Sequence, residues 1–486
     1  MAVAPFRLWI GGEPVDTAGH YEIVNPATEQ LVGVAPDAGA GEARAAAQAA
    51  AAAFPGWAAT PPAERGRLLA RAAELFERRF DELVPLVQAE TGSTLAMTRA
   101  VQVPTATARL RRYAAGAQEP TLLPLPPTPN LGGPGGGGTG LVSALGARRP
   151  VGVVAAITSY NVPLANVVGK LGPALAMGNT VVVKPAPQDP LGVIRLVETL
   201  HEAGFPPGVV NLVVGRGAAC GEALVTAPEV DMVSFTGSTA VGAAIAESAG
   251  RSFTRTLLEL GGKGASLVFA DADVEAAVAG TASTFAFHAG QICTAPTRLI
   301  AHRSVYDEVV SRLAALASAL PVGDPTDAAT VVGPVISAAQ RARVEDHVAS
   351  AVADGGTLVA GGERPALDTG FFVAPTLVAD CRPRTRAVQE EIFGPVVVAL
   401  PFDDDEEGVA LANDTEFGLY DYVWTRDTTR AMAVAARLRT GNVGINTVAR
   451  NPETPFGGFK HSGIGRDGGS FGLHAYSELQ SVVWPG

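Results

Sequence analysis

Apolar and polar positions alternate between two patterns in the central part of the chain. Short apolar runs, typical of buried strands, occur at 151–157, 180–183, 209–213 and 232–235. Apolar residues at helical spacing fill the intervening stretches 191–203, 218–226 and 240–248. This alternation predicts an α/β fold in which helices cover both faces of a parallel sheet. Such sheets commonly bind a dinucleotide at the carboxyl ends of their strands.

The N-terminal part of the chain predicts strands and then helices. Residues 6–35 read as short strands separated by Gly and Pro turns. Alanine, the strongest helix former, dominates 41–54, and helical spacing continues over 61–91 and from about 95 to 117. The next segment, 119–139, is rich in proline and glycine, which neither a helix nor a buried strand tolerates. It predicts a surface loop.

A second set of alternating patterns extends from 265 to about 443. Its strand-like runs lie near 265–269, 396–400 and 422–425, so it predicts a second α/β unit. The last segment, 473–483, is also strand-like, and it could add to a neighbour's sheet.

Composition narrows the class of protein. The 486 residues predict more than one domain, and 47% apolar residues allow a substantial buried core. A formal net charge of −12 argues against nucleic acid or an anionic membrane surface as the main partner. The N-terminus lacks the apolar core of a signal peptide, and no apolar run approaches the roughly 18 residues of a membrane span. We therefore expect a soluble, cytoplasmic protein.

The cysteines predict reduced thiols. Cys220, Cys293 and Cys381 are odd in number and far apart, which fits neither a disulfide framework nor a metal site. Cys293 lies in the segment FAFHAGQICTAPTR. A free thiol has a pKa of ~8.5, so a nucleophilic cysteine needs help from groups elsewhere in the chain. This segment alone leaves Cys293 as either a nucleophile or a small buried apolar residue.

Seven segments that occur in a fixed order along the chain favour the interpretation of Cys293 as a nucleophile. They are TSYNVPL with Asn161, VVVKP with Lys184, FTGSTAVG from Phe235, LELGGK with Glu259, GQIC with Cys293, EEIFGPV with Glu391, and PFGGFKHSGIGR from Pro455. Together they resemble the aldehyde dehydrogenase superfamily, over nearly the whole chain. The resemblance implies an enzyme that oxidises an aldehyde to a carboxylic acid with NAD or NADP as hydride acceptor.

The resemblance also implies roles for individual residues. Cys293 would attack the aldehyde and form a thiohemiacetal, and Asn161 would stabilise the oxyanion together with the Cys293 backbone N–H. Glu259 matches the general base that hydrolyses the thioester, which argues against the branch that transfers the acyl group to coenzyme A. Lys170 matches a proton-relay lysine. The acidic relay partner found in some members is assigned to Ser470, which predicts that the usual relay does not operate.

The cofactor site is implied by a second group of residues. After the 232–235 strand, a glycine-rich turn and a helix N-terminus favour phosphate binding. The resemblance assigns the cofactor to Gly237, Ser238 and Gly242 for the pyrophosphate, Lys184 for the adenosine ribose, and Glu391 and Phe393 for the nicotinamide ribose and ring. Many NAD-using members carry a glutamate where this chain has Pro187, so we expect NAD to be used and NADP to be tolerated.

The resemblance also divides the chain into domains. Residues 1–118 and 146–260 are expected to form a Rossmann-type cofactor domain, and 261–469 the catalytic domain. Residues 119–145 and 470–486 are expected to form oligomerisation segments, the first as a β excursion with the glycine run at 132–138 as its tip. The implied assembly is a homodimer or a homotetramer.

Substrate preference rests on three positions. Val162 and Gly169 are small where relatives often carry aromatic side chains, which predicts a wide tunnel for an aromatic or medium-chain aldehyde. Arg450 is either a surface residue or a group at the tunnel mouth that favours a substrate with a distal carboxylate. Two other functions stay open: a cysteine hydrolase with His288 as base, and a silent binding protein of this fold.

Overall fold

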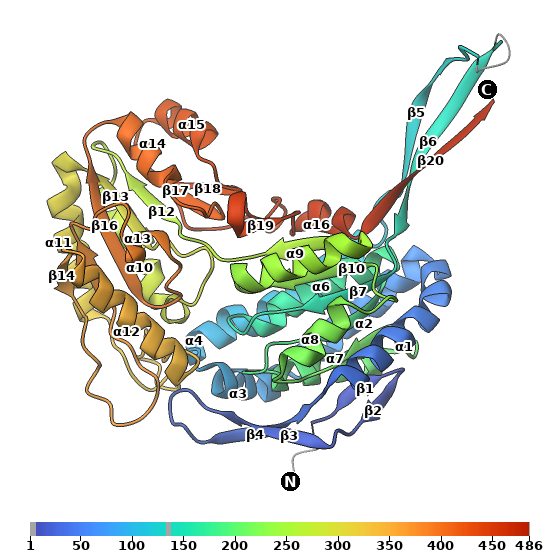
Figure 1. Ribbon diagram of the computed structural model, residues 1–486, viewed down its shortest axis with the longest axis horizontal. Coiled ribbons are helices and arrows are strands. Elements are labelled where there is room, and N and C mark those ends of the chain that lie inside the picture. Colours follow the sequence, from blue (N-terminus) through green and yellow to red (C-terminus); the bar gives the residue numbers. More distant parts are fainter. Residues whose placement is uncertain (1–5, 133–137, 486) are drawn as a thin grey trace.

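The chain folds into two α/β units that face each other, with a narrow three-stranded arm projecting from one of them (Figure 1). The structure is a computed structural model that describes residues 6–132 and 138–485. Within these residues, no helix has both the length and the apolar character needed to cross a membrane.

The first unit is built on an eight-stranded sheet. Its strands lie in the order β19 (Gly463–Ile464), β11 (Arg255–Glu259), β10 (Met232–Thr236), β7 (Val153–Ile157), β8 (Thr180–Lys184), β9 (Val210–Leu212), β1 (Leu8–Ile10) and β2 (Glu13–Val15). The strands from β11 to β9 pair in parallel, and the outer strands pair antiparallel. Both β7 and β8 are buried throughout, because their Val- and Ala-rich runs are covered on both faces.

Helices enclose this sheet and carry most of its apolar contacts. The connecting helices are α6 (Pro163–Met177), α7 (Leu191–Ala203), α8 (Ala218–Val225) and α9 (Thr239–Ser252). The N-terminal helices are α1 (Ala40–Ala59), α2 (Pro62–Arg78), α3 (Phe80–Thr91), α4 (Leu95–Met97), the π-helical turn η1 (Thr98–Gln102) and α5 (Val103–Gly116). Helix α5 packs along α6, and α1 packs on α8 and β8. A hairpin of β3 (Gly19–Val24) and β4 (Leu31–Asp37) completes the unit.

The second unit contains a seven-stranded sheet. Its order is β14 (Thr357–Ala360), β15 (Thr376–Ala379), β16 (Val396–Phe402), β13 (Arg298–His302), β12 (Ala265–Val268), β17 (Tyr420–Trp424) and β18 (Asn442–Ile445). All neighbours pair in parallel except β14 at the edge. Its helical elements are α10 (Val274–Ala286), η2 (His288–Gly290), α11 (Arg303–Ala319), α12 (Ala338–Ala353), α13 (Arg386–Gln389), α14 (Asp405–Asn413), α15 (Thr428–Arg437) and η3 (Lys460–Ser462).

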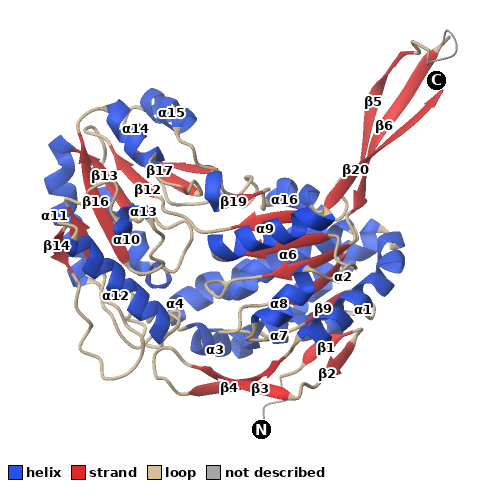
Figure 2. Cartoon of the chain, in the orientation of Figure 1, coloured by secondary structure: helices blue, strands red, loops and turns tan. Residues whose placement is uncertain are grey.

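The arm corrects two sequence predictions. It consists of β5 (Leu122–Pro129), β6 (Leu141–Pro150) and β20 (Ser477–Pro485), with β6 in the middle (Figure 2). The β excursion that the resemblance implied is confirmed, and the alternative of a loop over 119–139 was wrong for β5, whose prolines are tolerated because it is an edge strand. The prediction of one strand over 473–483 was wrong in part, because α16 (Gly469–Ala475) precedes β20, and β20 pairs with β6 of its own chain.

Two features bear on the predicted domain boundaries. The glycine run that was predicted to form the tip of the arm lies largely outside the described residues. The strand Gly463–Ile464, which was assigned to the catalytic domain, pairs with β11 of the first sheet. The C-terminal part of the chain therefore returns to the first unit, and the boundaries themselves stay a prediction.

Candidate active site

The parallel pairing of the first sheet brings the predicted site residues to one edge. Ile157 is in register with Lys184 on β8 and with Phe235 on β10, and Thr236 is in register with Glu259 on β11. All these strands end at the same level, so the turns that follow them share one edge of the sheet. Asn161 follows β7 in such a turn. The edge therefore gathers side chains from four separate parts of the chain.

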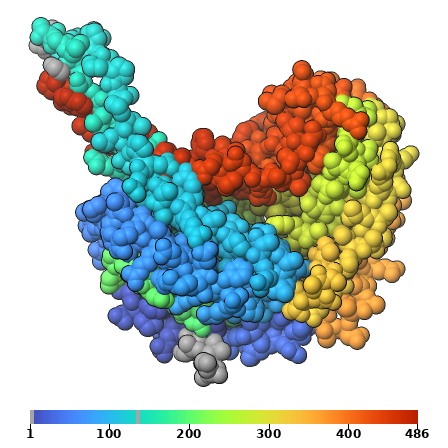
Figure 3. Space-filling view, turned by 180° about the vertical axis from the view of Figure 1, so that it is seen from behind, coloured from blue at the N-terminus to red at the C-terminus, as the bar shows by residue number. Residues whose placement is uncertain are grey.

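This edge opens into a cleft between the two units (Figure 3). The cavity has a volume of about 1520 Å³ and is lined by both units. The lining contains the predicted residues Asn161, Lys184, Gly237, Ser238, Glu259, Cys293, Glu391 and Phe393. Lys170 and Gly242, which were also predicted, are not part of the lining.

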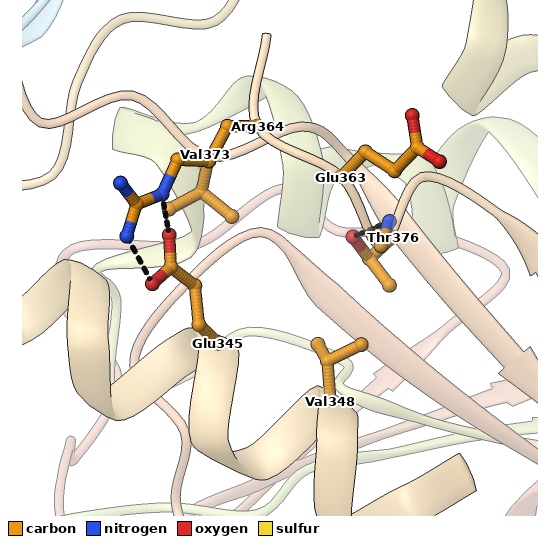
Figure 4. Close-up of a pocket in the computed structure, with 7 residues that line it drawn as sticks. Glu345, Val348, Glu363, Arg364, Val373 and Thr376 are labelled. Atoms are coloured by element: carbon orange, nitrogen blue, oxygen red, sulfur yellow. Dashed lines mark hydrogen bonds and ion pairs between the residues drawn. The ribbon is translucent and has the colours of Figure 1, made fainter.

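A second, smaller hollow offers no comparable chemistry. It has a volume of about 250 Å³ and lies beside α12, where the guanidinium of Arg364 donates hydrogen bonds of 2.5 and 2.8 Å to Glu345 (Figure 4). Its other lining side chains include Val348 and Val373. Because its charged pair is already satisfied and it contains no nucleophile, we place the site in the large cleft.

The loop that carries Cys293 is held by its backbone. Three successive residues from His288 to Gly290 have φ values of 51°, 50° and 74°, a left-handed run that reverses the chain after α10. A Cβ on Gly290 would collide with the carbonyl of Gly394, so this turn requires glycine. The side chain of Gln291 bridges the loop, accepting a hydrogen bond from the Ile336 N–H (2.9 Å). These contacts fix where the Cys293 thiol lies.

The surroundings of Cys293 keep its thiol protonated. Burial raises the pKa of Cys293 to about 12, with smaller effects from Arg450, which lowers it, and from the carboxyls of Glu391 and Glu259, which raise it. Thiolate formation therefore depends on a change in the charge around the sulfur.

Asn161 has an oriented amide. Its Oδ1 accepts hydrogen bonds from Ser159 Oγ (2.9 Å) and from Asn166 Nδ2 (3.2 Å), and its backbone carbonyl accepts one from Gln102 (3.1 Å). With Oδ1 engaged, Nδ2 is the remaining donor, and among the described residues it has no acceptor. This is the orientation that stabilisation of an oxyanion requires. Ser159 is one of the two groups that impose this orientation.

Glu259 is a buried carboxyl whose two oxygens have no hydrogen-bond partner among the described residues. Burial and the charge of Asp467 raise its pKa well above the usual range, and the cations of Lys170, Arg466 and Arg109 oppose that rise. A carboxylate of raised pKa is a stronger base than one in water, so Glu259 is suited to deprotonating a nucleophilic water.

The environment of Lys170 corrects one assignment. Its Nζ donates a hydrogen bond to Ser234 Oγ (3.2 Å) and lies 3.8 Å from the carboxylate of Asp467. Ser470 is instead hydrogen-bonded to Arg112 and Glu119, both at 3.0 Å. The assignment of the acidic relay position to Ser470 was therefore wrong, and Asp467 provides the carboxylate. The sequence contains this acid in the segment GIGRDGG, where Asp467 stands three residues before Ser470.

The predicted phosphate-binding turn lies between β10 and α9, but Gly242 does not line the cleft. Ser238 caps α9, its hydroxyl accepting from the Val241 N–H (3.4 Å), and Gly237 donates to the Glu259 carbonyl (3.1 Å). Gly242 packs against the side chain of Leu260, where any Cβ would collide with it. Its small size therefore serves the packing of α9 on the sheet. A helix N-terminus beside this turn fits an anionic phosphate.

The nicotinamide end contains Glu391 and Phe393. The Gly262 N–H donates to Glu391 Oε1 (2.9 Å), and burial raises the pKa of Glu391 to about 7. Phe393 has a left-handed φ of 60°, and its ring meets Tyr160 edge-on at 5.8 Å between centroids. A buried carboxylate beside an aromatic wall fits a ribose and a planar ring, so the residues present fit a dinucleotide.

The substrate end differs from the predicted wide tunnel. Val162 lines the cleft as expected. The space beside Gly169 is not free, because a Cβ built there would lie 2.6 Å from the guanidinium of Arg109 on α5. That guanidinium donates a hydrogen bond to the Ala165 carbonyl. Sequence reasoning missed Arg109, since nothing in its helical segment marks it as facing the cleft.

Arg450 lies at the cleft and not on a remote surface. It donates to the hydroxyl of Thr294, the residue after Cys293, and its guanidinium lies 5.6 Å and 5.5 Å from the ring centroids of Tyr420 and Phe456. Arg450 is nevertheless exposed, so whether it contacts the substrate or only solvent stays a prediction.

His288 does not serve Cys293 as a base. Its imidazole is buried, is not part of the cleft lining, and finds no hydrogen-bond partner among the described residues. Burial lowers the pKa of His288 to about 4. A hydrolase that uses this histidine is therefore not supported.

The cleft places a cysteine beside a strand edge suited to a dinucleotide, within an α/β fold. The aldehyde dehydrogenase family model matches residues 14–482, and the chain belongs to the aldehyde dehydrogenase family. The predicted fold class, family and enzymatic nature are thereby confirmed. The role of each site residue stays a prediction.

Individual relatives cover almost the full chain. Phenylacetaldehyde dehydrogenase of Pseudomonas fluorescens is 39% identical over 99% of this chain and 96% of its own. 2-Hydroxymuconic semialdehyde dehydrogenase of Pseudomonas sp. strain CF600 is 39% identical over 95% of each. The solved structure of betaine aldehyde dehydrogenase from Staphylococcus aureus in complex with NAD+ is 34% identical, with a TM-score of 0.93 over 98% of this chain and 94% of that chain.

Proposed function

We propose that the protein oxidises an aromatic or medium-chain aldehyde to its carboxylic acid, with NAD as the hydride acceptor. The observation that carries this proposal is the convergence of Cys293, Asn161 and Glu259 on one cleft that also contains a dinucleotide-type strand edge.

The residues of the cleft divide the reaction between them. The Cys293 sulfur attacks the carbonyl carbon, and Asn161 Nδ2 with the Cys293 N–H holds the oxygen as it becomes negative. Lys184, Ser238, Glu391 and Phe393 would hold NAD, which would supply the hydride acceptor for the resulting thiohemiacetal. Glu259 then takes a proton from the water that attacks the thioester, and the acid leaves as the thiol is restored. Lys170 and Asp467 hold opposite charges behind Glu259 and set its basicity.

The proposed substrate size follows from the cleft and agrees with the names of two relatives. Val162 leaves room after Asn161, and the walls near Cys293 include the stacked rings of Tyr420 and Tyr422, 4.7 Å apart between centroids. One relative is named for phenylacetaldehyde and another for 2-hydroxymuconic semialdehyde. Both are larger than acetaldehyde, so we expect acetaldehyde to be the poorer substrate.

The cofactor preference rests on the ribose end of the cleft. The betaine aldehyde dehydrogenase structure contains NAD+. In this chain Pro187 lines the cleft close to Lys184, where no carboxylate side chain from that position repels a 2′-phosphate. We therefore propose that NAD is used and NADP is tolerated.

We propose a homo-oligomer, a dimer or a tetramer, in a reducing cytoplasm. The arm supports the assembly, since all of β5 and nearly all of β20 are exposed and carry apolar side chains. The cysteines support the compartment, since all three are free thiols.

A panel of aldehydes with each cofactor, followed at 340 nm as reduced nicotinamide forms, tests the function. We expect phenylacetaldehyde or hexanal to exceed acetaldehyde in kcat/KM. Cys293→Ala should abolish oxidation while NAD binding, measured by calorimetry, stays near that of the parent. The control Cys381→Ala removes a buried thiol outside the cleft and should retain activity. Oxidation that survives in Cys293→Ala would reassign the nucleophile.

A further inference from the structure

Five arginines line the cleft, and they differ in what neutralises them: Arg109, Arg112, Arg216, Arg343 and Arg450. Arg112 forms ion pairs with Glu119 (2.9 Å) and Glu453 (2.6 Å), and Arg216 pairs with Asp37 (2.9 Å). Arg343 donates to the backbone carbonyl of Glu391 (2.7 Å), at the nicotinamide end.

Arg109 and Arg450 remain without a carboxylate partner in the described part of the chain. Arg109 hydrogen-bonds only the carbonyl of Ala165, and Arg450 only the hydroxyl of Thr294. Among the acids that line the cleft, Glu453 pairs with Arg112, and Asp467 lies 3.8 Å from Lys170. Glu259 is close enough for the charge of Arg109 to lower its pKa, but it forms no hydrogen bond with either arginine. Both guanidiniums therefore keep donors that no carboxylate of the described residues occupies.

These two arginines approach the reaction centre from opposite units. Arg109 projects from α5 onto α6, the helix that follows Asn161, and Arg450 lies beside the residue that follows Cys293. An aldehyde bound between Asn161 and Cys293 would extend its far end between them. A guanidinium has five N–H donors in a planar fork that matches a carboxylate, and each of these arginines uses few of them on the protein.

Gly169 makes the position of Arg109 possible. A Cβ at residue 169 would lie 2.6 Å from the Arg109 guanidinium, so any side chain there displaces it from its place on α6. The glycine therefore does not leave an empty tunnel. It makes room for a cation.

We propose that the substrates of this site are medium-length aldehydes with a carboxylate at the end distant from the aldehyde, and that Arg109 and Arg450 bind that carboxylate. This inference rests on the proposed function and narrows its substrate class. A carboxylate held by a guanidinium fork gains charge-assisted hydrogen bonds that an uncharged aldehyde of the same length cannot make.

The test compares 6-oxohexanoate with hexanal, which share a chain length and differ in the terminal group. We expect the parent enzyme to favour 6-oxohexanoate at least about tenfold in kcat/KM. Arg109→Met should lower kcat/KM for 6-oxohexanoate about tenfold or more relative to hexanal, mainly through KM. The result is read as the ratio between the two aldehydes, because the charge of Arg109 also lowers the pKa of Glu259 and its loss affects both. Gly169→Ala should also lower kcat/KM for 6-oxohexanoate, because its Cβ displaces the Arg109 guanidinium without removing it.

Two further variants separate binding from other effects. For Arg450→Met, the informative quantity is the ratio of kcat/KM for 6-oxohexanoate to kcat/KM for hexanal, which should fall. Arg450 also lowers the pKa of Cys293, so its loss slows the oxidation of both aldehydes. Arg111→Met is the matched control, since Arg111 lies on the same helix but pairs with Glu77 on the surface. It should leave the ratio unchanged.

Inhibition provides a measurement that does not depend on the rate of chemistry. With hexanal as substrate, adipate should compete in the parent and about tenfold more weakly in Arg109→Met. Equal use of the two aldehydes by the parent, or equal loss of both in Arg109→Met, would overturn the carboxylate proposal while the dehydrogenase function stands. Failure of the parent to oxidise any aldehyde would refute the function itself.

Discussion

Cys293 and Glu259 influence each other through charge. The pKa of the Cys293 thiol is raised to about 12, mainly by burial, and the Glu259 carboxylate contributes to that rise. A neutral side chain at residue 259 therefore favours the thiolate, whereas it removes the base for the second half of the reaction. The two half-reactions should respond to one substitution in opposite ways.

Glu259→Gln tests this division. We expect a burst of about one reduced cofactor per active site, followed by turnover slowed about 10²–10⁴-fold, the usual contribution of a general base. Stopped-flow absorbance at 340 nm separates the phases. If burst and steady state fall together, Glu259 acts before hydride transfer or supports the fold.

Pro187 is a second position where one side chain should decide a preference. In the parent, NADP should be used within roughly a thousandfold of NAD, about 4 kcal/mol. Pro187→Glu should lower kcat/KM for NADP about tenfold or more and affect NAD little, because a carboxylate beside a 2′-phosphate is repelled. Pro187→Gln is the uncharged control. A parent that already excludes NADP would point to another group.

At the scale of elements, the site depends on three segments that meet behind Glu259. Helix α6 carries Lys170, β11 ends at Glu259, and the turn before α16 carries Asp467. Lys170 lowers the pKa of Glu259 and Asp467 raises it, and the two charges are themselves paired at 3.8 Å. Without Lys170, the unpaired charge of Asp467 should raise the pKa of Glu259. Without Asp467, the unpaired charge of Lys170 should lower it.

The pH dependence of turnover should show those opposite signs. A general base works above its pKa, so the acidic limb of the kcat profile follows the pKa of Glu259 where deacylation limits. Asp467→Asn should lower that pKa and move the limb to lower pH, and Lys170→Met should raise it and move the limb to higher pH. Ser470→Ala, at the residue first assigned to this role, should leave the limb in place. Shifts in the same direction for both variants would exclude a charge effect.

Elements were easier to predict from the sequence than their contacts. Buried parallel strands such as β7 and β8 are continuous Val- and Ala-rich runs, so their pattern identifies them. The apolar run over 473–483 was ambiguous because a short buried helix and a strand share such a pattern, and here α16 precedes β20. The partner of Lys170 and the place of Arg109 could not be predicted, since both depend on how distant elements pack.

At the scale of the whole molecule, the two units share the cleft, and neither contains a complete site. Asn161 and Glu259 come from the first unit, and Cys293, Glu391 and Arg450 follow strands or helices of the second. Backbone contacts join the two sides, as where the Leu95 N–H donates a hydrogen bond to the Pro325 carbonyl (2.7 Å). The chain therefore has to assemble as a whole before any of the chemistry is possible.

The arm exposes apolar side chains that neither α/β unit of the chain covers. On β20, Leu479 is 63% exposed and Val483 is 58% exposed. They lie four residues apart on one strand, so they share one face. An isolated three-stranded sheet with bare apolar faces is poorly stable in water, which favours its burial against a second copy.

The double substitution Leu479→Glu with Val483→Glu should therefore reduce the assembly to a smaller one. Light scattering after size exclusion measures its mass against the 49.6 kDa mass of one chain. Met432→Glu is the control, since Met432 is 62% exposed on α15, away from the arm. An unchanged mass in the double variant would mean that another surface holds the copies together.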